Sequence, residues 1–296
     1  MESTAGVNEK NKAKKRRGPW RDVGRRLIKN KMAVVGLIIL LIIVVTAIFA
    51  DQIAPYGERA IAHNTSNRLQ GPSAENWLGT DDLGRDIFAR IIHGARISLM
   101  VGFVAVGIAV VAGGFLGIVA GYYGGRIDNI IMRFTDIFLA IPSILLAIAI
   151  VAAFGGSIFN MMVAIGVSSI PQFARIVRAS VLQVKDQEFI ESARAVGAND
   201  ARIMIKHIIP NSLAPVIVQA TLGVASAILS TAGLAFIGLA IPKPTPEWGS
   251  MLSDSRSFLR MAPHMATFPG LAIMTTILAL NLLGDGLRDA LDPKLK

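Results

Sequence analysis

Residues 32–50 read MAVVGLIILLIIVVTAIFA and contain no charged side chain. A helix of about 20 apolar residues crosses the hydrocarbon core of a bilayer, and a charge at its centre costs about 2.5 to 3.5 kcal/mol. The run therefore predicts a membrane-spanning helix. Because 31 residues precede it and no Ala-x-Ala pattern comes before Asp51, we expect a retained anchor and not a cleaved signal peptide.

The composition of the whole chain agrees with a membrane protein. Of its 296 residues, 53% are hydrophobic and only 17% are charged, and the mean hydropathy is +0.55. Soluble domains carry about 25% charged residues, so an ordinary water-soluble enzyme is excluded. The chain has no cysteine, and its four histidines are scattered without ligand spacing. We therefore expect no catalytic residue and no metal site in this chain.

Residues 1–31 form a basic segment directly before the first span. Eleven lysines and arginines against three acidic residues give this segment a net charge of +8. Basic residues beside a span favour the cytoplasmic side, where they lie near anionic lipid. An arm that binds RNA or DNA is the alternative, but the rest of the chain is too apolar to be a groove reader, so we expect no nucleic-acid partner.

Further charge-free runs predict five more spanning helices. Residues 97–125 contain one, and Gly113, Gly117 and Gly121 on its face would let a neighbouring backbone approach closely. Residues 137–174 are too long for one span, and the small residues 155–157 near their middle predict a hairpin of two. The last two spans are expected at 213–234 and 261–284. The chain is thus expected to be an all-α membrane protein with six transmembrane helices.

Six spans and a cytoplasmic N-terminus place both termini in the cytoplasm. The chain then divides into a basic cytoplasmic tail (1–31), a first transmembrane helix with an external segment (32–93), and a five-helix core (94–296). The longest cytoplasmic loop of that core is residues 186–210.

Two features that the sequence lacks restrict the classes of function that it can have. The chain has no G-x-x-x-x-G-K-[ST] phosphate loop, so it is not an ATPase of that kind. An ion-coupled carrier usually has ionisable groups at mid-membrane. The nearest candidates here are Arg133 and Asp136, which are three residues apart at the beginning of a helix and are expected to pair with each other.

Residues 186–210 read DQEFIESARAVGANDARIMIKHIIP. Phe189, Ala193 and Val196 follow the spacing of a helix face, with Asp186 as the expected N-cap and Gly197 as the stop. The sequence therefore predicts a short helix that ends at this glycine.

A second short helix is predicted after Gly197. Asn199 or Asp200 can cap it, Ile203 and Ile205 lie within it, and Pro210 is expected to follow its end. Two short helices around a glycine would project into the cytoplasm.

This loop resembles the EAA signature of permease subunits of binding-protein-dependent ABC importers, which is EAA, three residues, Gly, nine residues and I-x-L-P. The positions that correspond to this signature are Glu191, Ser192, Ala193, Gly197, His207, Ile209 and Pro210. Three of them depart from it: Ser192 replaces Ala, His207 replaces Ile and Ile209 replaces Leu.

Three other stretches narrow the resemblance. They are LGTDDLGRD at 78–86, GARISL at 94–99 and NLLGDGLRDALDP at 281–293. They are similar to the C-type permease subunit of dipeptide and oligopeptide transporters, and the similarity extends from about residue 20 onward.

The resemblance implies a type I ABC importer (MetI-like) permease fold in a prokaryotic cell membrane. It implies a second homologous permease subunit, two ATPase subunits that bind ATP and Mg, and an extracytoplasmic solute-binding protein. It also implies that the 186–210 loop couples to the ATPases, and that this chain holds no cofactor of its own.

Small and polar residues mark one face of the fifth predicted span. Gln219, Gly223, Ser226, Ser230 and Gly233 recur at helical spacing. Two interpretations stay open: helix packing alone, or a wall of the translocation path, for which Gln219, Ser226 and Ser230 are the candidate residues.

The identity of the solute also stays open. Di- or oligopeptides are expected, with nickel, glutathione or another small solute as alternatives. A passive channel or an ion-coupled carrier would explain six spans but not the 186–210 loop, and a purely structural anchor would not need a polar face within a span.

Overall fold

The computed structural model describes residues 19–291 and is helical throughout that range, apart from loops and one isolated bridge between Thr80 and Asp86. The all-α prediction is confirmed. The elements in chain order are α1 (Pro19–Lys29), α2 (Lys31–Ile48), α3 (Ala50–Ile53), η1 (Tyr56–Ala60), η2 (Thr65–Asn67), α4 (Ile87–Tyr123), α5 (Gly125–Leu139), α6 (Ser143–Phe154), α7 (Ile158–Lys185), α8 (Glu188–Ala195), α9 (Asp200–Ile203), η3 (Met204–Ile208), α10 (Ile209–Phe236), α11 (Trp248–Asp254), η4 (Ser255–Phe258) and α12 (His264–Leu291).

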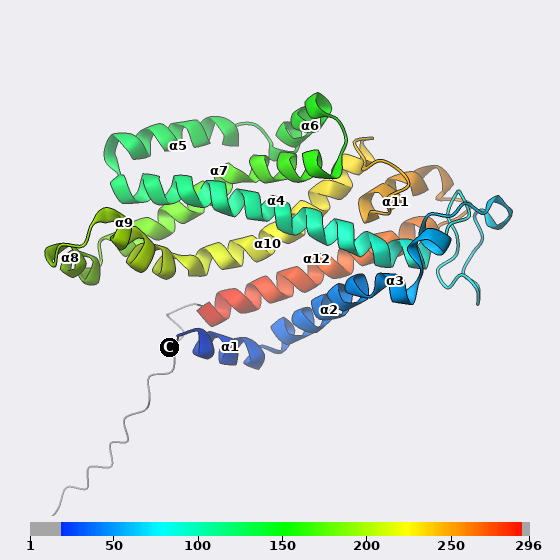
Figure 1. The fold of residues 1–296 in the computed structure, drawn as a ribbon, viewed down its shortest axis with the longest axis horizontal. Coiled ribbons are helices and arrows are strands. Elements are labelled where there is room, and N and C mark those ends of the chain that lie inside the picture. Colours follow the sequence, from blue (N-terminus) through cyan, green and yellow to red (C-terminus); the bar gives the residue numbers. More distant parts are fainter. Residues whose placement is uncertain (1–18, 292–296) are drawn as a thin grey trace, which may run out of the picture.

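The long helices lie side by side and give the protein two distinct ends (Figure 1). One end carries α8 and α9 and is called the α8 end. The other carries α11 and the segment between α3 and α4, and is called the α11 end. The end of α12 and the beginning of α1 both lie toward the α8 end, as an even number of passes requires.

Four helices are long and apolar enough to cross a membrane: α2, α4, α10 as the continuation of α9, and α12. A fifth span results if α5 and α6, which bend by 82° at their junction, are taken together. The remaining predicted span, the second arm of the hairpin, corresponds to α7, which has 28 residues but includes Asn160, Gln172 and Arg175. The count of six therefore stays a prediction.

The first arm of the predicted hairpin is not one straight helix. The expected segment begins at residue 137, inside α5, and the chain breaks at residues 140–142 before α6 begins. Pro142 is the cause, because it disfavours helical backbone at the preceding residue. The 12 residues of α6 span only about 18 Å, too short to cross a bilayer alone. The predicted turn at 155–157 does separate α6 from α7.

The glycine ladder of α4 packs against α7 as the sequence predicts. A Cβ atom added at Gly113 would lie 2.7 Å from the carbonyl oxygen of Ile170, and one at Gly117 would lie 2.5 Å from that of Ala174. Only hydrogen side chains allow this approach, so α4 and α7 pack closely along this seam.

The first spanning helix is joined to the core in the same way. A Cβ atom at Gly36 of α2 would lie 2.6 Å from the carbonyl oxygen of Ala279 in α12, and one at Gly286 would meet the Cβ of Ala33. Asn30 fixes the junction of α1 and α2, since its side chain caps α2 and donates to Asp289 Oδ2 at 3.3 Å. The boundary predicted at residue 93 lies inside α4, which begins at Ile87.

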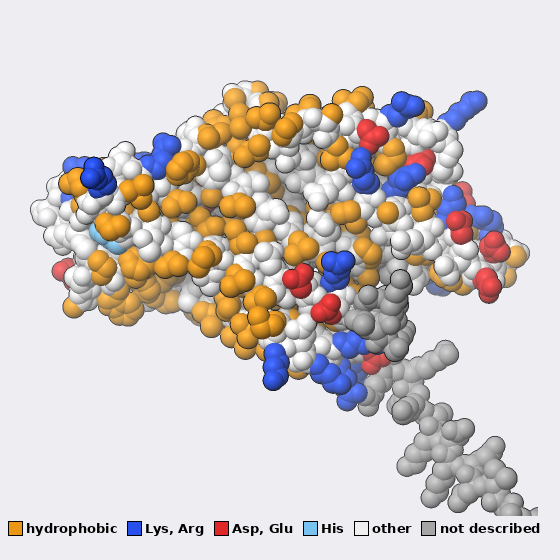
Figure 2. All heavy atoms as spheres, turned by 180° about the vertical axis from the view of Figure 1, so that it is seen from behind, with side chains coloured by type: hydrophobic (Ala, Val, Ile, Leu, Met, Phe, Trp, Pro, Cys, Tyr) orange, Lys and Arg blue, Asp and Glu red, His pale blue; other side chains and the backbone are white. Residues whose placement is uncertain are grey.

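Hydrophobic side chains cover most of the visible face, and most charged side chains gather toward the ends (Figure 2). Exposed apolar residues such as Val111 (74%) and Phe115 (67%) of α4 are expected where lipid is the solvent. Residues 1–18 of the predicted basic tail lie outside the described range. Within it, α1 keeps the basic character, with Arg21, Arg25 and Lys29 all exposed.

Candidate functional site

The 186–210 loop forms the tip of the α8 end. Its first helix, α8, has Gln187 as N-cap, so the prediction of Asp186 in that role is wrong. Asp186 instead ends α7, where its backbone N–H donates to the carbonyl of Val184. α7 continues to Lys185, well beyond the predicted end of the hairpin at residue 174, so Asp186 caps α7 and the N-cap of α8 falls on Gln187.

Gly197 ends α8 in the predicted way. Its φ of +85° is a left-handed conformation that glycine adopts without a Cβ penalty. The Gly197 N–H donates to the carbonyl of Arg194 at 3.0 Å, and the Ala198 N–H donates to that of Ala193 at 3.1 Å. These two bonds are the Schellman arrangement, which satisfies the last carbonyls of the helix and turns the chain sharply.

The second half of the loop differs from the prediction. Asn199 caps α9 by accepting from the N–H of Arg202 at 2.9 Å, as expected. The helix does not end before Pro210, because α9 passes through the π-helical turn η3 directly into α10. Pro210 lies in the first turn of α10, where its fixed φ suits a helix. The loop is therefore rigidly continuous with α10.

The buried face of α8 is not the one that the sequence predicts. Phe189 and Val196, which were expected to form the apolar stripe, are 43% and 89% exposed, whereas Ile190 is buried. In the second half Ile203 is buried and Ile205 is 69% exposed. The loop therefore presents three apolar side chains, Phe189, Val196 and Ile205, away from its own protein.

The seven predicted coupling residues lie at one end of the molecule but do not form a pocket. Glu191 and Ser192 are exposed on α8, and Ala193 is half-buried beside them. The His207 ring lies 6.4 Å from the ring of Phe189, which brings the two halves of the loop together. The others are Gly197 in the turn, and Ile209 and Pro210 in the first turn of α10.

Apolar and polar contacts hold the loop on the core. Ile190, Ile203 and Ile208 are buried in a cluster with Tyr122 of α4, Val177 and Val181 of α7 and Val216 of α10. The Tyr122 hydroxyl lies 2.5 Å from Asp200 Oδ1, which links α4 to the beginning of α9. The loop is thus seated on three long helices.

Two ion pairs join α5 to α7 near this end. Arg178 contacts both carboxylate oxygens of Asp128, at 2.5 and 2.6 Å. Arg175 Nη2 lies 2.7 Å from Asp136 Oδ1. Asp136 is therefore paired with Arg175, and the expectation that it pairs with Arg133 is wrong. A partner 39 positions away gives better geometry than one on the same helix.

The small and polar face of α10 is divided between packing and solvent-accessible space. Gly223 faces Phe173 and Val106, and Gly233 faces Ile144, so these glycines serve helix packing. Ser226 is exposed, while Gln219 and Ser230 are half-buried. The serine hydroxyls donate to carbonyls one turn earlier, at 3.3 Å for Ser226 and 2.9 Å for Ser230. The candidate residues Gln219, Ser226 and Ser230 thus share an accessible face.

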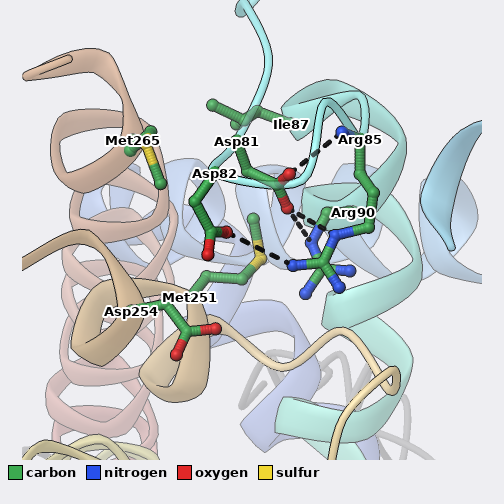
Figure 3. A pocket seen from close by; sticks show the side chains of 8 residues that line it. All are labelled: Asp81, Asp82, Arg85, Ile87, Arg90, Met251, Asp254 and Met265. Carbon is green, nitrogen blue, oxygen red and sulfur yellow. Dashed lines mark hydrogen bonds and ion pairs between the residues drawn. The ribbon is translucent and has the colours of Figure 1, made fainter. Parts of the chain in front are cut away.

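A buried ionic cluster lies at the α11 end and was missed from the sequence (Figure 3). Arg85 is 1% exposed and Arg90 is 2% exposed, and their Nε atoms lie 2.6 and 3.4 Å from Asp81 Oδ2. Arg90 also donates to the carbonyl of Ala60 at 2.9 Å. Asp254 of α11 and Met265 of α12 line the same pocket.

The cluster includes residues of the LGTDDLGRD stretch at 78–86. In the sequence, this stretch indicated only the resemblance to a permease family. The ion pair between Arg90 and Asp81 joins the 78–86 segment to the beginning of α4. Buried charges require partners, so this network holds the 78–86 segment in one arrangement.

The residues before α11 close the same end of the molecule. Glu247 is 2% exposed, caps α11 through the N–H groups of Gly249 and Ser250, and accepts from Ser98 of α4 at 3.0 Å. The Trp248 indole donates to the carbonyl of Ile91 at 2.9 Å. The beginning of α4 is therefore fixed to α11 by two hydrogen-bonded side chains.

Most of the chain matches two described families. Residues 113–296 match "Binding-protein-dependent transport system inner membrane component", and residues 18–72 match "N-terminal TM domain of oligopeptide transport permease C". The two matched regions together include the 186–210 loop, α2 and the face of α10.

Similar proteins are known in bacteria. The chain is 55% identical over 280 residues to the dipeptide transport system permease protein DppC of Alkalihalophilus pseudofirmus, covering 94% of this chain and 91% of that protein. It is 47% identical to the glutathione transport system permease protein GsiD of Pectobacterium atrosepticum, covering 95% and 93%.

Solved structures share the fold at lower identity. An inward-facing structure of the MetNI methionine ABC transporter aligns with a TM-score of 0.56 and 18% identity, covering 69% of this chain and 96% of that chain. An amino acid ABC transporter crystallised with histidines aligns with a TM-score of 0.54 and 18% identity, covering 68% and 94%.

Proposed function

Because this chain belongs to the family of inner membrane components of binding-protein-dependent transport systems, and is a multi-pass permease, we propose that it carries di- or oligopeptides across the cell membrane. Support for the solute class comes from the 55% identical dipeptide permease. The 47% identical relative is a glutathione permease, which marks glutathione as an alternative solute. Glutathione, nickel or another small solute is the alternative that the transport experiment below distinguishes.

The 186–210 loop is the proposed contact with the ATPase subunits. The observation that carries this assignment is the exposure of Phe189, Val196 and Ile205 at the tip of the α8 end. Exposed apolar side chains at the end of a helical bundle are typical of a surface that a protein partner covers. The apolar side chains of the loop therefore serve as the docking face, with Glu191 and Ser192 beside them.

The loop is also suited to transmit movement. It is continuous with α10 through η3, and α7 leads into it at Lys185. A force on the loop from nucleotide-driven movement of the ATPases therefore tilts α7 and α10 as rigid elements. The accessible face of α10 with Gln219, Ser226 and Ser230 then lines a path that a second homologous permease completes.

The proposed assembly contains this chain, the second permease, two ATPases and an extracytoplasmic solute-binding protein. ATP and Mg bind to the ATPases, and this chain supplies no cofactor site. The α8 end faces the cytoplasm of a prokaryotic cell together with both termini, since the exposed Arg21, Arg25 and Lys29 of α1 favour that side. The α11 end then faces the binding protein.

Transport by the complete complex in proteoliposomes tests the solute. We expect ATP-dependent uptake of labelled di- and tripeptides when the cognate binding protein is present, and no uptake without ATP. Uptake of Ni²⁺ or glutathione in place of peptides would overturn the peptide assignment. Uptake that continues without ATP or the ATPase subunits would overturn the importer assignment.

Purification of the complex tests the docking face. A variant with Phe189→Ser, Val196→Ser and Ile205→Ser should lose the ATPase subunits. The matched control is Val111→Ser, which removes an exposed apolar side chain from the spanning part of α4. Full ATPase stoichiometry in the triple variant would contradict the assignment.

A further inference from the structure

We propose that the hydrogen bond between Tyr122 and Asp200 is the contact through which the 186–210 loop moves α4, which makes Tyr122 a positioning residue for transport. The inference rests on the proposed function, because it assumes that the ATPases act on this loop. It adds a route that leads from the loop to a helix not adjacent to it in sequence.

Tyr122 is placed to make this link. It is the second-last residue of α4, its side chain is buried in the cluster with Ile190 and Ile203, and its hydroxyl lies 2.5 Å from Asp200 Oδ1. Asp200 is the first residue of α9, directly after the cap residue Asn199. The hydroxyl is therefore bonded to the end of the short helix that leads into α10.

Arg194 strengthens the junction from the other half of the loop. It lies on α8 and interacts with the same Tyr122 hydroxyl, and this contact raises the pKa of the arginine above its ordinary value. One phenol on α4 thus contacts both short helices of the loop. A hydrogen bond to an ionised carboxylate is stronger than one between neutral groups, so the junction resists sliding.

α4 is one unbroken helix from Ile87 to Tyr123. It has 37 residues, which gives a length of about 55 Å. α7, α10 and α12 each contain an internal proline, at Pro171, Pro215 and Pro269, whereas α4 contains none. Because α4 runs unbroken from Ile87 to Tyr123, a displacement at one end can reach the other.

The far end of α4 is fixed to the external elements. Ser98 donates to Glu247 at 3.0 Å, the Trp248 indole donates to the carbonyl of Ile91, and Arg90 pairs with Asp81. A movement that begins at Tyr122 can therefore reach α11 and the 78–86 segment along α4 itself. In the proposed orientation, these are the elements that face the binding protein.

The chain offers a variant pair that separates this role from a structural one. Tyr122→Phe removes the hydroxyl and keeps the buried ring, and Asp200 is exposed to solvent, so the fold and the apolar cluster remain. Tyr123→Phe is the matched control, because Tyr123 is the neighbouring residue, is 48% exposed and has its ring 5.2 Å from that of Tyr122.

The measurement is ATP hydrolysis by the complete complex in proteoliposomes, with and without peptide-loaded binding protein. Tyr122→Phe should keep wild-type ATPase stoichiometry, thermal stability and basal hydrolysis, but show about tenfold weaker stimulation, which corresponds to about 1.4 kcal/mol. Asp200→Ala should show a similar loss, and the double variant should lose no more than either single variant, since all three remove one bond. Tyr123→Phe should behave like the wild type.

Normal stimulation of Tyr122→Phe would overturn the inference while leaving the proposed function intact, provided the wild-type complex is stimulated. Additive losses in the double variant, or an equal loss in Tyr123→Phe, would also overturn it. If even the wild-type complex shows no stimulation by loaded binding protein, the proposed function fails and the inference fails with it.

Discussion

Arg96 of α4 holds the end of α2 through Asp51 and the backbone. Its Nη1 atom lies 2.7 Å from Asp51 Oδ2, and its Nη2 atom donates to the carbonyl of Ile48 at 2.8 Å. Its Nε atom also donates to the carbonyl of Ala47. A cation at the carboxyl end of a helix satisfies unpaired carbonyls and opposes the helix dipole. This one side chain therefore joins the first span to the core at the α11 end.

Arg96→Ala should lower the melting temperature of the purified protein more than Asp51→Asn. The guanidinium serves two backbone carbonyls, and a hydrogen bond that involves a charged group contributes about 1.5 to 3 kcal/mol. The carboxylate is exposed, so its ion pair is screened by solvent. Thermal unfolding of both variants in detergent checks the order, and an equal or larger effect of Asp51→Asn would contradict it.

Gly117→Val should prevent the close packing of α4 on α7, because the added Cβ would lie 2.5 Å from the carbonyl oxygen of Ala174. Gly114→Val is the matched control, since a Cβ there has no atom within 4 Å and valine has a higher helix propensity than glycine. The yield of monodisperse protein and its melting temperature measure the difference. Similar behaviour of both variants would show that the α4–α7 seam is not as close as described.

A cysteine at Ser73 should react with membrane-impermeant thiol reagents in intact cells, and one at Ala195 should react only with permeant reagents. Both side chains are exposed, and they lie at the α11 and α8 ends respectively. The chain has no native cysteine, so each variant carries a single reactive thiol. The reverse pattern of labelling would invert the proposed orientation.

Ser226→Trp and Ser230→Trp should reduce peptide uptake strongly while the complex still assembles. The new rings would occupy the accessible face of α10, where small residues leave space for solute. Leu229→Trp is the control on the same helix, since Leu229 is already large and 59% exposed. Wild-type uptake by both serine variants would mean that the path lies elsewhere.

Sequence patterns predicted local features correctly where the backbone conformation or the helix spacing favours one residue type. Gly197 was predicted from the sequence because a φ of +85° at a helix end favours glycine, and the ladder from Gly113 to Gly121 was predicted because its spacing repeats on one helix face. These features depend on the chain within a few residues. The break at Pro142 carried the same kind of signal but was overlooked in favour of the length of the apolar run.

Long-range contacts were not predictable in the same way. Periodicity marked Phe189 and Val196 as one face of α8, but not whether the chain itself or a partner covers that face. Arg133 was the nearest partner of Asp136 in sequence, whereas Arg175 is the partner in the fold. Arg85 and Asp81 lie in a stretch that indicated only a family resemblance, and packing by distant elements buries them.

Stimulated ATP hydrolysis by Gly197 and Glu191 variants tests the coupling role of the 186–210 loop most directly. Gly197→Val places a β-branched residue at positive φ, which costs about 1 kcal/mol or more and tilts α9, and Glu191→Lys reverses a charge in the first turn of α8. Gly155→Val is the matched control, because Gly155 has a φ of +90° in equally open space between α6 and α7. With loaded binding protein, both loop variants should lose stimulation or the ATPase subunits while Gly155→Val keeps both. Full stimulation and full subunit stoichiometry in both loop variants would contradict the coupling role.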